Sequence, residues 1–82
     1  MVSRTTPRRV ARTLRDAGFR SPGRRRPAGF HVDWRDDGLV VIVTYLGNAN
    51  IDARCGMVTD YRKALNSDGW SVSQVGDYAV VY

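Results

Sequence analysis

The sequence predicts a small α+β domain in which two helices pack on one face of a four-stranded, mainly antiparallel sheet, in the order αββαββ. Three observations lead to this prediction. Two segments show the apolar spacing of amphipathic helices, four segments have the features of strands, and short turn signals separate the strands of each pair. With 82 residues the chain is expected to be one domain, residues 1–82, near the lower size limit for a single hydrophobic core.

The first helix is expected at residues 7–17. Thr6 suits the N-cap, Pro7 suits the first helical position, and Gly18 suits the left-handed residue that ends a helix. If Gly18 ends the helix in a Schellman motif, Phe19 packs against Leu14. The segment also carries two opposed stripes at helical spacing. They are an apolar stripe of Val10, Leu14 and Ala17 and a basic stripe of Arg8, Arg12 and Arg15.

A loop and a first strand hairpin follow this helix. Residues 20–29 hold two prolines, two glycines and four arginines, which predicts a flexible loop. Residues 30–35 alternate between apolar and polar side chains, as in a half-buried strand, and residues 36–38 are expected to form the turn. Residues 39–46 are rich in β-branched residues and apolar on both faces, which predicts an interior strand.

The second helix should end at Gly69, but its start is open. Asn50 or Asp52 suits the N-cap of a long helix, whereas Thr59 suits the cap of a shorter helix that avoids Gly56. Its apolar side consists of Met57, Val58, Tyr61, Ala64 and Leu65.

The chain closes with a predicted hairpin that joins residues 70–75 to residues 78–82. Residues 14–19 align with residues 65–70, and each segment has a leucine, a glycine stop and an aromatic residue before its hairpin. This near-repeat fits two readings. One is the duplication of an αββ unit, and the other is a common way for a chain to leave a helix.

Charge is divided unevenly along the chain. The first 26 residues carry nine of the twelve arginines and one aspartate, a formal charge of +8, whereas four basic groups and seven aspartates give the remainder −3. Guanidinium groups pair with phosphates, so these arginines are candidate nucleic-acid-binding residues. The candidates are Arg8, Arg12, Arg15, Arg24, Arg25 and Arg26. The alternative is a solubilising surface in an arginine-rich proteome, since the composition is typical of GC-rich coding.

Protein contacts are a different use of the same surfaces. The basic face also suits an acidic protein partner, and an open strand edge at residues 78–82 suits a homodimer. If Ala79 and Val81 face the helices, Tyr78 and Tyr82 stand on the open sheet face, where bases can stack. The opposite register buries both tyrosines.

Several other classes of protein do not fit the sequence. The longest apolar run, residues 39–43, is far shorter than the roughly 20 residues of a membrane span, and the N-terminal segment lacks the apolar core of a signal peptide. Cys55 alone forms neither an internal disulfide nor a thiolate zinc site. We therefore expect a cytoplasmic protein that is not an enzyme, has no metal or cofactor and does not associate with membranes.

His31 is the one residue for which catalysis is considered. It shares a strand face with Asp33 and Arg35, so it is either a general acid or base, or an ordinary solvated residue. The run from Leu14 to Phe19, followed by arginines and then Gly29, Phe30 and His31, resembles the start of HicA-type mRNA interferases. This resemblance covers about the first half of the chain. It implies a fold like that of double-stranded-RNA-binding domains, in which His31 is catalytic and Gly29 is the motif glycine.

Most of the chain is similar to short, arginine-rich, uncharacterised proteins of actinobacterial genomes and their phages and mobile elements. The shared features are the motif at residues 29–32, a valine-rich strand, a Tyr-x-x-x-Leu helix at residues 61–65, and the glycine motifs at residues 69–72 and 76–80. Because these motifs are structural, the resemblance implies the fold and a phage-related origin without naming a function.

Overall fold

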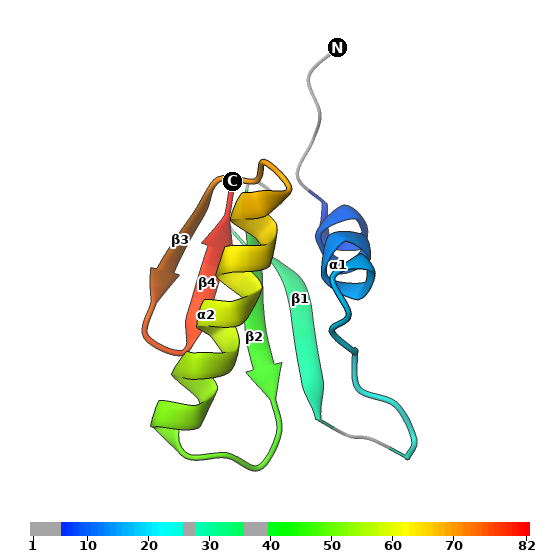
Figure 1. Cartoon of the computed structure of the whole chain (residues 1–82), viewed down its shortest axis with the longest axis vertical. Helices are drawn as coiled ribbons and strands as arrows, with labels where there is room; N and C mark the ends of the chain where they lie inside the picture. The colour runs from blue at the N-terminus through cyan, green and yellow to red at the C-terminus, as the bar shows by residue number, and fades with distance from the viewer. Residues whose placement is uncertain (1–5, 26–27, 36–39) are drawn as a thin grey trace.

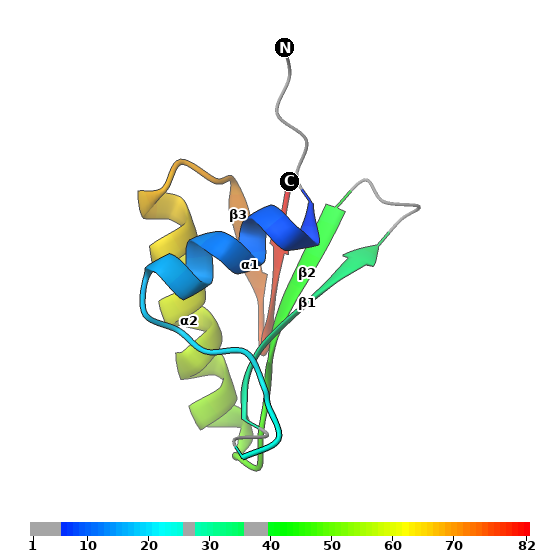
Figure 2. The same cartoon turned by 90° about the vertical axis from the view of Figure 1, so that its right-hand side faces the viewer.

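Two helices cover one face of a four-stranded antiparallel sheet (Figures 1 and 2). The computed structural model describes residues 6–25, 28–35 and 40–82. The elements in chain order are α1 (Pro7–Asp16), β1 (Gly29–Arg35), β2 (Val40–Leu46), α2 (Ile51–Ser67), β3 (Val72–Val75) and β4 (Tyr78–Val81). The predicted α+β fold with the order αββαββ is therefore confirmed. The predicted turn at residues 36–38 lies outside the described residues.

The strand order is β1-β2-β4-β3, with every neighbouring pair antiparallel. The valine-rich strand β2 is interior, as its apolar character on both faces predicts. β4 is interior as well, because it pairs with both β2 and β3, so the prediction that residues 78–82 form an open strand edge is wrong; the edge strands are β1 and β3. In this register Val43 is opposite both Val32 of β1 and Ala79 of β4. The order is symmetric about the β2–β4 pair, which is one of the arrangements that two equivalent αββ units can form. Their common origin stays a prediction.

Both helices end in Schellman motifs, as the paired Leu-Gly-aromatic patterns predict. Gly18 and Gly69 have φ angles of 98° and 93°, in the left-handed region that a side chain disfavours. The closing backbone hydrogen bonds, each 3.0 Å long, run from Gly18 to Arg15, Phe19 to Leu14, Gly69 to Asn66 and Trp70 to Leu65. Because Trp70 completes the end of α2, β3 begins at Val72 rather than at residue 70.

The structure selects the longer of the two predicted versions of α2. The side-chain oxygen of Asn50 accepts a hydrogen bond from the Ala53 amide at 2.8 Å, which satisfies one of the free N–H groups of the first turn. Gly56 lies inside the helix and is exposed. Thr59 does not start the helix. Its hydroxyl instead donates to the carbonyl oxygen of Cys55 at 2.8 Å.

The core lies between the helices and the inner face of the sheet. Its fully buried members are Val10, Leu14, Val41, Val43, Val58, Leu65, Ala79 and Val81, and Ala11, Phe30 and Tyr61 are nearly so. The expected apolar stripe of α1 is correct for Val10 and Leu14, but Ala17 is exposed. Ala17 is the C-cap of α1, where the chain turns away from the sheet, and Ala11 takes the buried position instead.

The base of the loop at residues 20–28 is closed by a hydrogen bond from the Phe30 amide to the Arg20 carbonyl oxygen, 3.0 Å long. Gly29 lies beside this bond with a φ of 157°, and a Cβ atom on Gly29 would collide with the Arg20 carbonyl oxygen. A glycine is therefore required where the end of α1 returns to the sheet. β1 begins at Gly29, one residue earlier than predicted.

We predict that Gly29→Ala lowers the free energy of unfolding by about 2 kcal/mol or more, because the new methyl group forces backbone apart at the loop base. Gly23→Ala is the matched control, since a Cβ atom there meets no atom within 4 Å and Gly23 has no positive φ. Its effect should stay within about 1 kcal/mol. Urea denaturation of the three proteins measures both values, and equal stabilities of the two variants would contradict the assigned role of Gly29.

Candidate nucleic-acid interface

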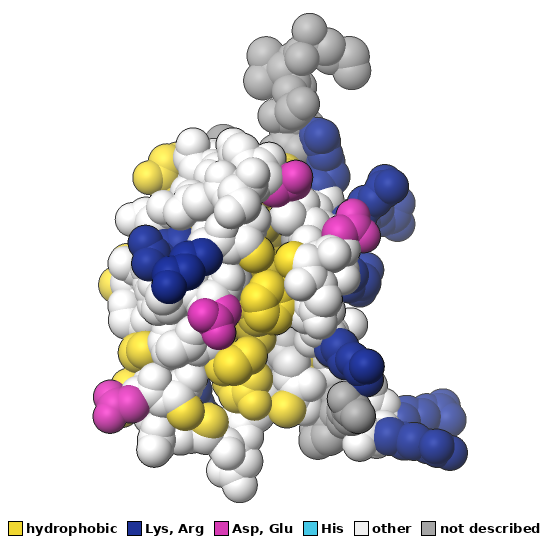
Figure 3. Space-filling view, viewed as in Figure 1, with side chains coloured by type: hydrophobic (Ala, Val, Ile, Leu, Met, Phe, Trp, Pro, Cys, Tyr) yellow, Lys and Arg dark blue, Asp and Glu magenta, His cyan; other side chains and the backbone are white. Residues whose placement is uncertain are grey.

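The predicted basic residues form an exposed band on one side of the molecule. In Figure 3 most of the dark-blue side chains gather over α1 and the loop that follows it, and a separate group lies over α2. We define the arginine band as the exposed residues Arg8, Arg12, Arg15, Arg20, Arg24 and Arg25. Five of the six predicted site residues belong to it, and Arg20 is an addition. Arg26 lies outside the described residues.

The band is exposed because α1 uses its other side for the core. Val10 and Leu14 are completely buried between α1 and the sheet, which turns the basic stripe outward. The guanidinium carbon of Arg15 lies 5.9 Å from the centroid of the Phe30 ring, a cation–π distance that holds one side chain of the band close to β1. The long separation of Arg15 and Phe30 in the sequence hides this contact from sequence reasoning.

Among the described residues no acidic side chain forms an ion pair with the arginine band, and the carboxylate of Asp16 lines the same hollow as Arg12. An ion pair joins Arg54 to Asp77 at 3.9 Å, away from the band. Arg9, next to the band, lies with its guanidinium carbon 5.9 Å from the centroid of the Trp70 ring. Clustered charges of one sign raise the local potential and attract mobile ions or ligands of the opposite sign. The band is thus a surface suited to a polyanion.

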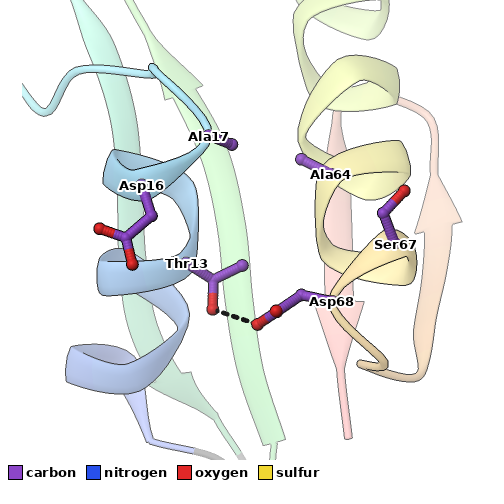
Figure 4. A pocket seen from close by; sticks show the side chains of 6 residues that line it. All are labelled: Thr13, Asp16, Ala17, Ala64, Ser67 and Asp68. Carbon is purple, nitrogen blue, oxygen red and sulfur yellow. Dashed lines mark hydrogen bonds between the residues drawn. The ribbon is translucent and has the colours of Figure 1, made fainter.

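An acidic cleft of about 270 Å³ separates the C-terminal ends of α1 and α2 (Figure 4). Ala17 and Ala64 face each other across it, and their small side chains leave the space open. The Thr13 hydroxyl donates to a carboxylate oxygen of Asp68 at 2.9 Å and accepts a hydrogen bond from the Trp70 indole at 3.1 Å. Asp16 also lines this cleft. The carboxylates of Asp16 and Asp68 make this cleft unfavourable for a phosphate group.

A second, larger cavity of about 530 Å³ lies where the loop, β2 and α2 meet, and we call it the aromatic pocket. It is lined chiefly by Phe19, Arg20, Arg25, Tyr45, Met57 and Tyr61. The rings of Phe19 and Tyr61 meet edge to face with centroids 5.0 Å apart. Burial, followed by the nearby Tyr45 and Asp60, raises the pKa of Tyr61 to about 12. Its phenol is therefore neutral near pH 7.

Sequence reasoning did not find the aromatic pocket, because its walls come from four separate segments. The loop arginines and the predicted contact of Phe19 with Leu14 are the only signals that pointed to this part of the molecule.

The open face of the sheet has the register that exposes its tyrosines. Ala79 and Val81 are fully buried against the helices, so Tyr78 and Tyr82 project from the other face. Tyr82 is 58% exposed. A shallow depression of about 290 Å³ on this face is lined by Arg35, Val40, Ile42, Tyr78 and Val80.

His31 is exposed on the same open face, opposite Thr44 of β2. Its neighbour Asp33 accepts a hydrogen bond from the Trp34 amide at 2.8 Å, so this carboxylate is engaged by its own strand. Among the described residues no hydrogen bond orients the imidazole, and no group of three or more His, Cys or Asp side chains is placed to hold a metal ion. A catalytic role for His31 stays a prediction from the family resemblance.

Neither described helix combines the length and the hydropathy required to cross a bilayer. Comparisons of the chain with models of protein families, with curated proteins and with solved structures found no match. The function must therefore be inferred from the surface itself.

We predict that ionisation of Tyr61 makes stability fall at high pH. The pKa of Tyr61 is about 12 in the folded chain, against 10.0 for a free tyrosine. The neutral phenol therefore contributes stability that is complete below about pH 10 and is lost as the pH rises through about 12. Each pKa unit corresponds to 1.36 kcal/mol, so the loss is about 2 to 3 kcal/mol. Urea denaturation at about pH 9 and about pH 12 measures how much the free energy of unfolding falls between the two pH values. The fall should be smaller for Tyr61→Phe than for the wild type, and an equal fall would contradict the raised pKa of Tyr61.

Proposed function

We propose that this protein binds nucleic acid through the arginine band and does not catalyse a reaction on it. The observation that carries the proposal is the outward projection of the band from α1 and the following loop, with no acidic side chain of the described residues paired to it. An arginine donates two parallel hydrogen bonds to a phosphate, which makes a row of arginines well suited to a nucleic-acid backbone. A phage-related origin belongs to the same proposal.

The two parts of the band lie on different kinds of segment, a helix and a loop. Arg8, Arg12 and Arg15 project from one helix, along about 10 Å of its axis at a rise of 1.5 Å per residue. Arg24 and Arg25 lie on a loop whose base is closed at Gly29. Contacts of both parts with phosphate release counterions, so binding depends steeply on salt and only weakly on base sequence.

Self-association through the open sheet face is a second candidate, because that face exposes large apolar side chains. Leu46, Val75 and Tyr82 are 43%, 50% and 58% exposed, and strand alternation places all three on the open face. Exposed apolar residues that gather on one surface are typical of protein contacts. A dimer formed through this face leaves the arginine band free.

We predict that five or six phosphate contacts give a plot of log K against log salt concentration with a slope of about −5. Two double variants remove two arginines each: one combines Arg8→Gln with Arg12→Gln, and the other combines Arg24→Gln with Arg25→Gln. Each double variant should reduce the magnitude of the slope by about 2. Fluorescence anisotropy of a labelled oligonucleotide at several salt concentrations measures the slopes.

The matched control is Arg35→Gln with Lys63→Gln, which removes the same charge from exposed residues outside the band. It should leave the slope nearly unchanged. If the three double variants lose affinity equally, net charge rather than the arginine band explains binding. If the wild-type protein has no affinity at low salt, the proposed function is wrong.

For the second candidate, we predict that the wild-type chain forms dimers as its concentration rises and that Val75→Glu remains monomeric, because the new charge would have to be buried. Ile51→Glu is the control, since Ile51 is equally apolar, 58% exposed, and lies at the start of α2 instead of on the sheet. Sedimentation equilibrium measures the association. A monomeric wild-type protein at high concentration excludes this candidate.

A further inference from the structure

We infer that the aromatic pocket accepts an unpaired base, so that the nucleic acid held by the arginine band is single-stranded where it meets the pocket. The inference rests on the proposed function and adds to it the class of nucleic acid and the place where a base is held.

The walls of the pocket have the chemistry of a base-stacking site. Phe19 and Tyr45 are partly exposed and supply aromatic surface, with the buried ring of Tyr61 packed against Phe19, and Met57 adds a polarizable thioether. Flat bases stack on such side chains in proteins that bind single strands, whatever the base sequence. The volume of about 530 Å³ lies within the usual range of small-molecule sites, so a planar base has room to enter.

Two arginines connect the pocket to the arginine band. Arg20 and Arg25 line the pocket and are exposed members of the band. A strand whose phosphates follow the band along α1 therefore reaches the pocket at its loop end. Figure 3 shows hydrophobic side chains along the boundary between the two helices, with the basic side chains beside them. No acidic side chain is among the described residues that line this pocket.

Three other hollows lack this combination. The cleft between the helix ends and the adjoining hollow beside Arg12 and Trp70 are both lined by Asp16 and Asp68, which repel phosphate. The depression on the open sheet face has Tyr78 but only one arginine, Arg35, whose strand also carries Asp33. Bases that stacked on the sheet would lie away from the band.

A single strand fits the site better than a duplex or an acidic peptide. Paired bases are stacked on each other, and moving one into a pocket costs a few kcal/mol of unstacking, which an unpaired base avoids. A peptide with acidic and aromatic residues also matches the pocket. However, the band extends along α1 far beyond it, and a nucleic-acid strand carries a negative charge at every residue.

The test compares affinities for a labelled single-stranded oligothymidylate and for its duplex with oligoadenylate, at one salt concentration. Tyr45→Val removes aromatic surface from the pocket and keeps a side chain suited to β2. Tyr82→Val makes the same substitution on the open sheet face, where Tyr82 is 58% exposed. We expect Tyr45→Val to lower the ratio of single-strand to duplex affinity about tenfold, and Tyr82→Val to leave that ratio as in the wild type.

If Tyr45→Val has the same ratio of single-strand to duplex affinity as the wild type, the inference is wrong. If only Tyr82→Val lowers this ratio, the bases stack on the open sheet face and the inference is also wrong. In either case the proposed function survives if the salt slope still depends on the band. No binding of either oligonucleotide rejects both. A copolymer of glutamate and tyrosine serves as the acidic peptide probe. If Tyr45→Val weakens binding of this copolymer but does not change the affinity for either oligonucleotide, the pocket belongs to an acidic protein partner and the inference is wrong.

A second measurement does not depend on the folding of a variant. Irradiation of the wild-type chain with an oligonucleotide that carries 5-iodouracil crosslinks the base to neighbouring aromatic residues. Peptides that contain Phe19 or Tyr45 should be labelled. Labelling confined to Tyr78 or Tyr82 overturns the inference.

Discussion

The hydrogen bond from Phe30 to Arg20, made beside Gly29, determines how the basic part of the chain is attached to the folded part. It joins the end of the α1 segment to the first residues of β1 and closes the intervening loop. Since Arg20 carries both this carbonyl and a guanidinium of the band, the same residue anchors the backbone and lines the aromatic pocket. A side chain on Gly29 would separate these parts, so a glycine there is a condition for the whole surface.

The molecule separates packing from charge by using different faces of the same elements. α1 buries Val10 and Leu14 and exposes arginines, while β4 buries Ala79 and Val81 and turns Tyr78 to the open face. Acidic groups lie at the cleft between the helix ends, where Asp16 borders the band beside Arg12, and on the open sheet face. A polyanion is consequently favoured on one side and repelled on others. This distribution favours a defined docking surface over uniform attraction by net charge.

Local chemistry made much of the fold predictable. Thr6 caps α1 by accepting a hydrogen bond from the Arg9 amide at 3.2 Å, and both predicted Schellman motifs are present, because capping depends on neighbouring residues only. The sequence leaves the start of α2 ambiguous, because the low helix propensity of Gly56 favours a start at Thr59 whereas Asn50 suits the N-cap of a longer helix. An interior glycine costs about 1 kcal/mol relative to alanine, and the Asn50 cap together with the burial of Val58 and Tyr61 outweighs that cost.

By itself, the sequence determined the element order, the interior position of β2 and the outward direction of the basic stripe, since each depends on spacing within one segment. Only the tertiary structure decided which face of β4 is buried, that Arg15 lies against Phe30, and that Tyr45 and Tyr61 form a pocket with Arg20. Those features depend on strand register and on how separate segments pack. A one-residue change in register reverses a strand's faces, and local sequence patterns do not specify it when both faces are apolar.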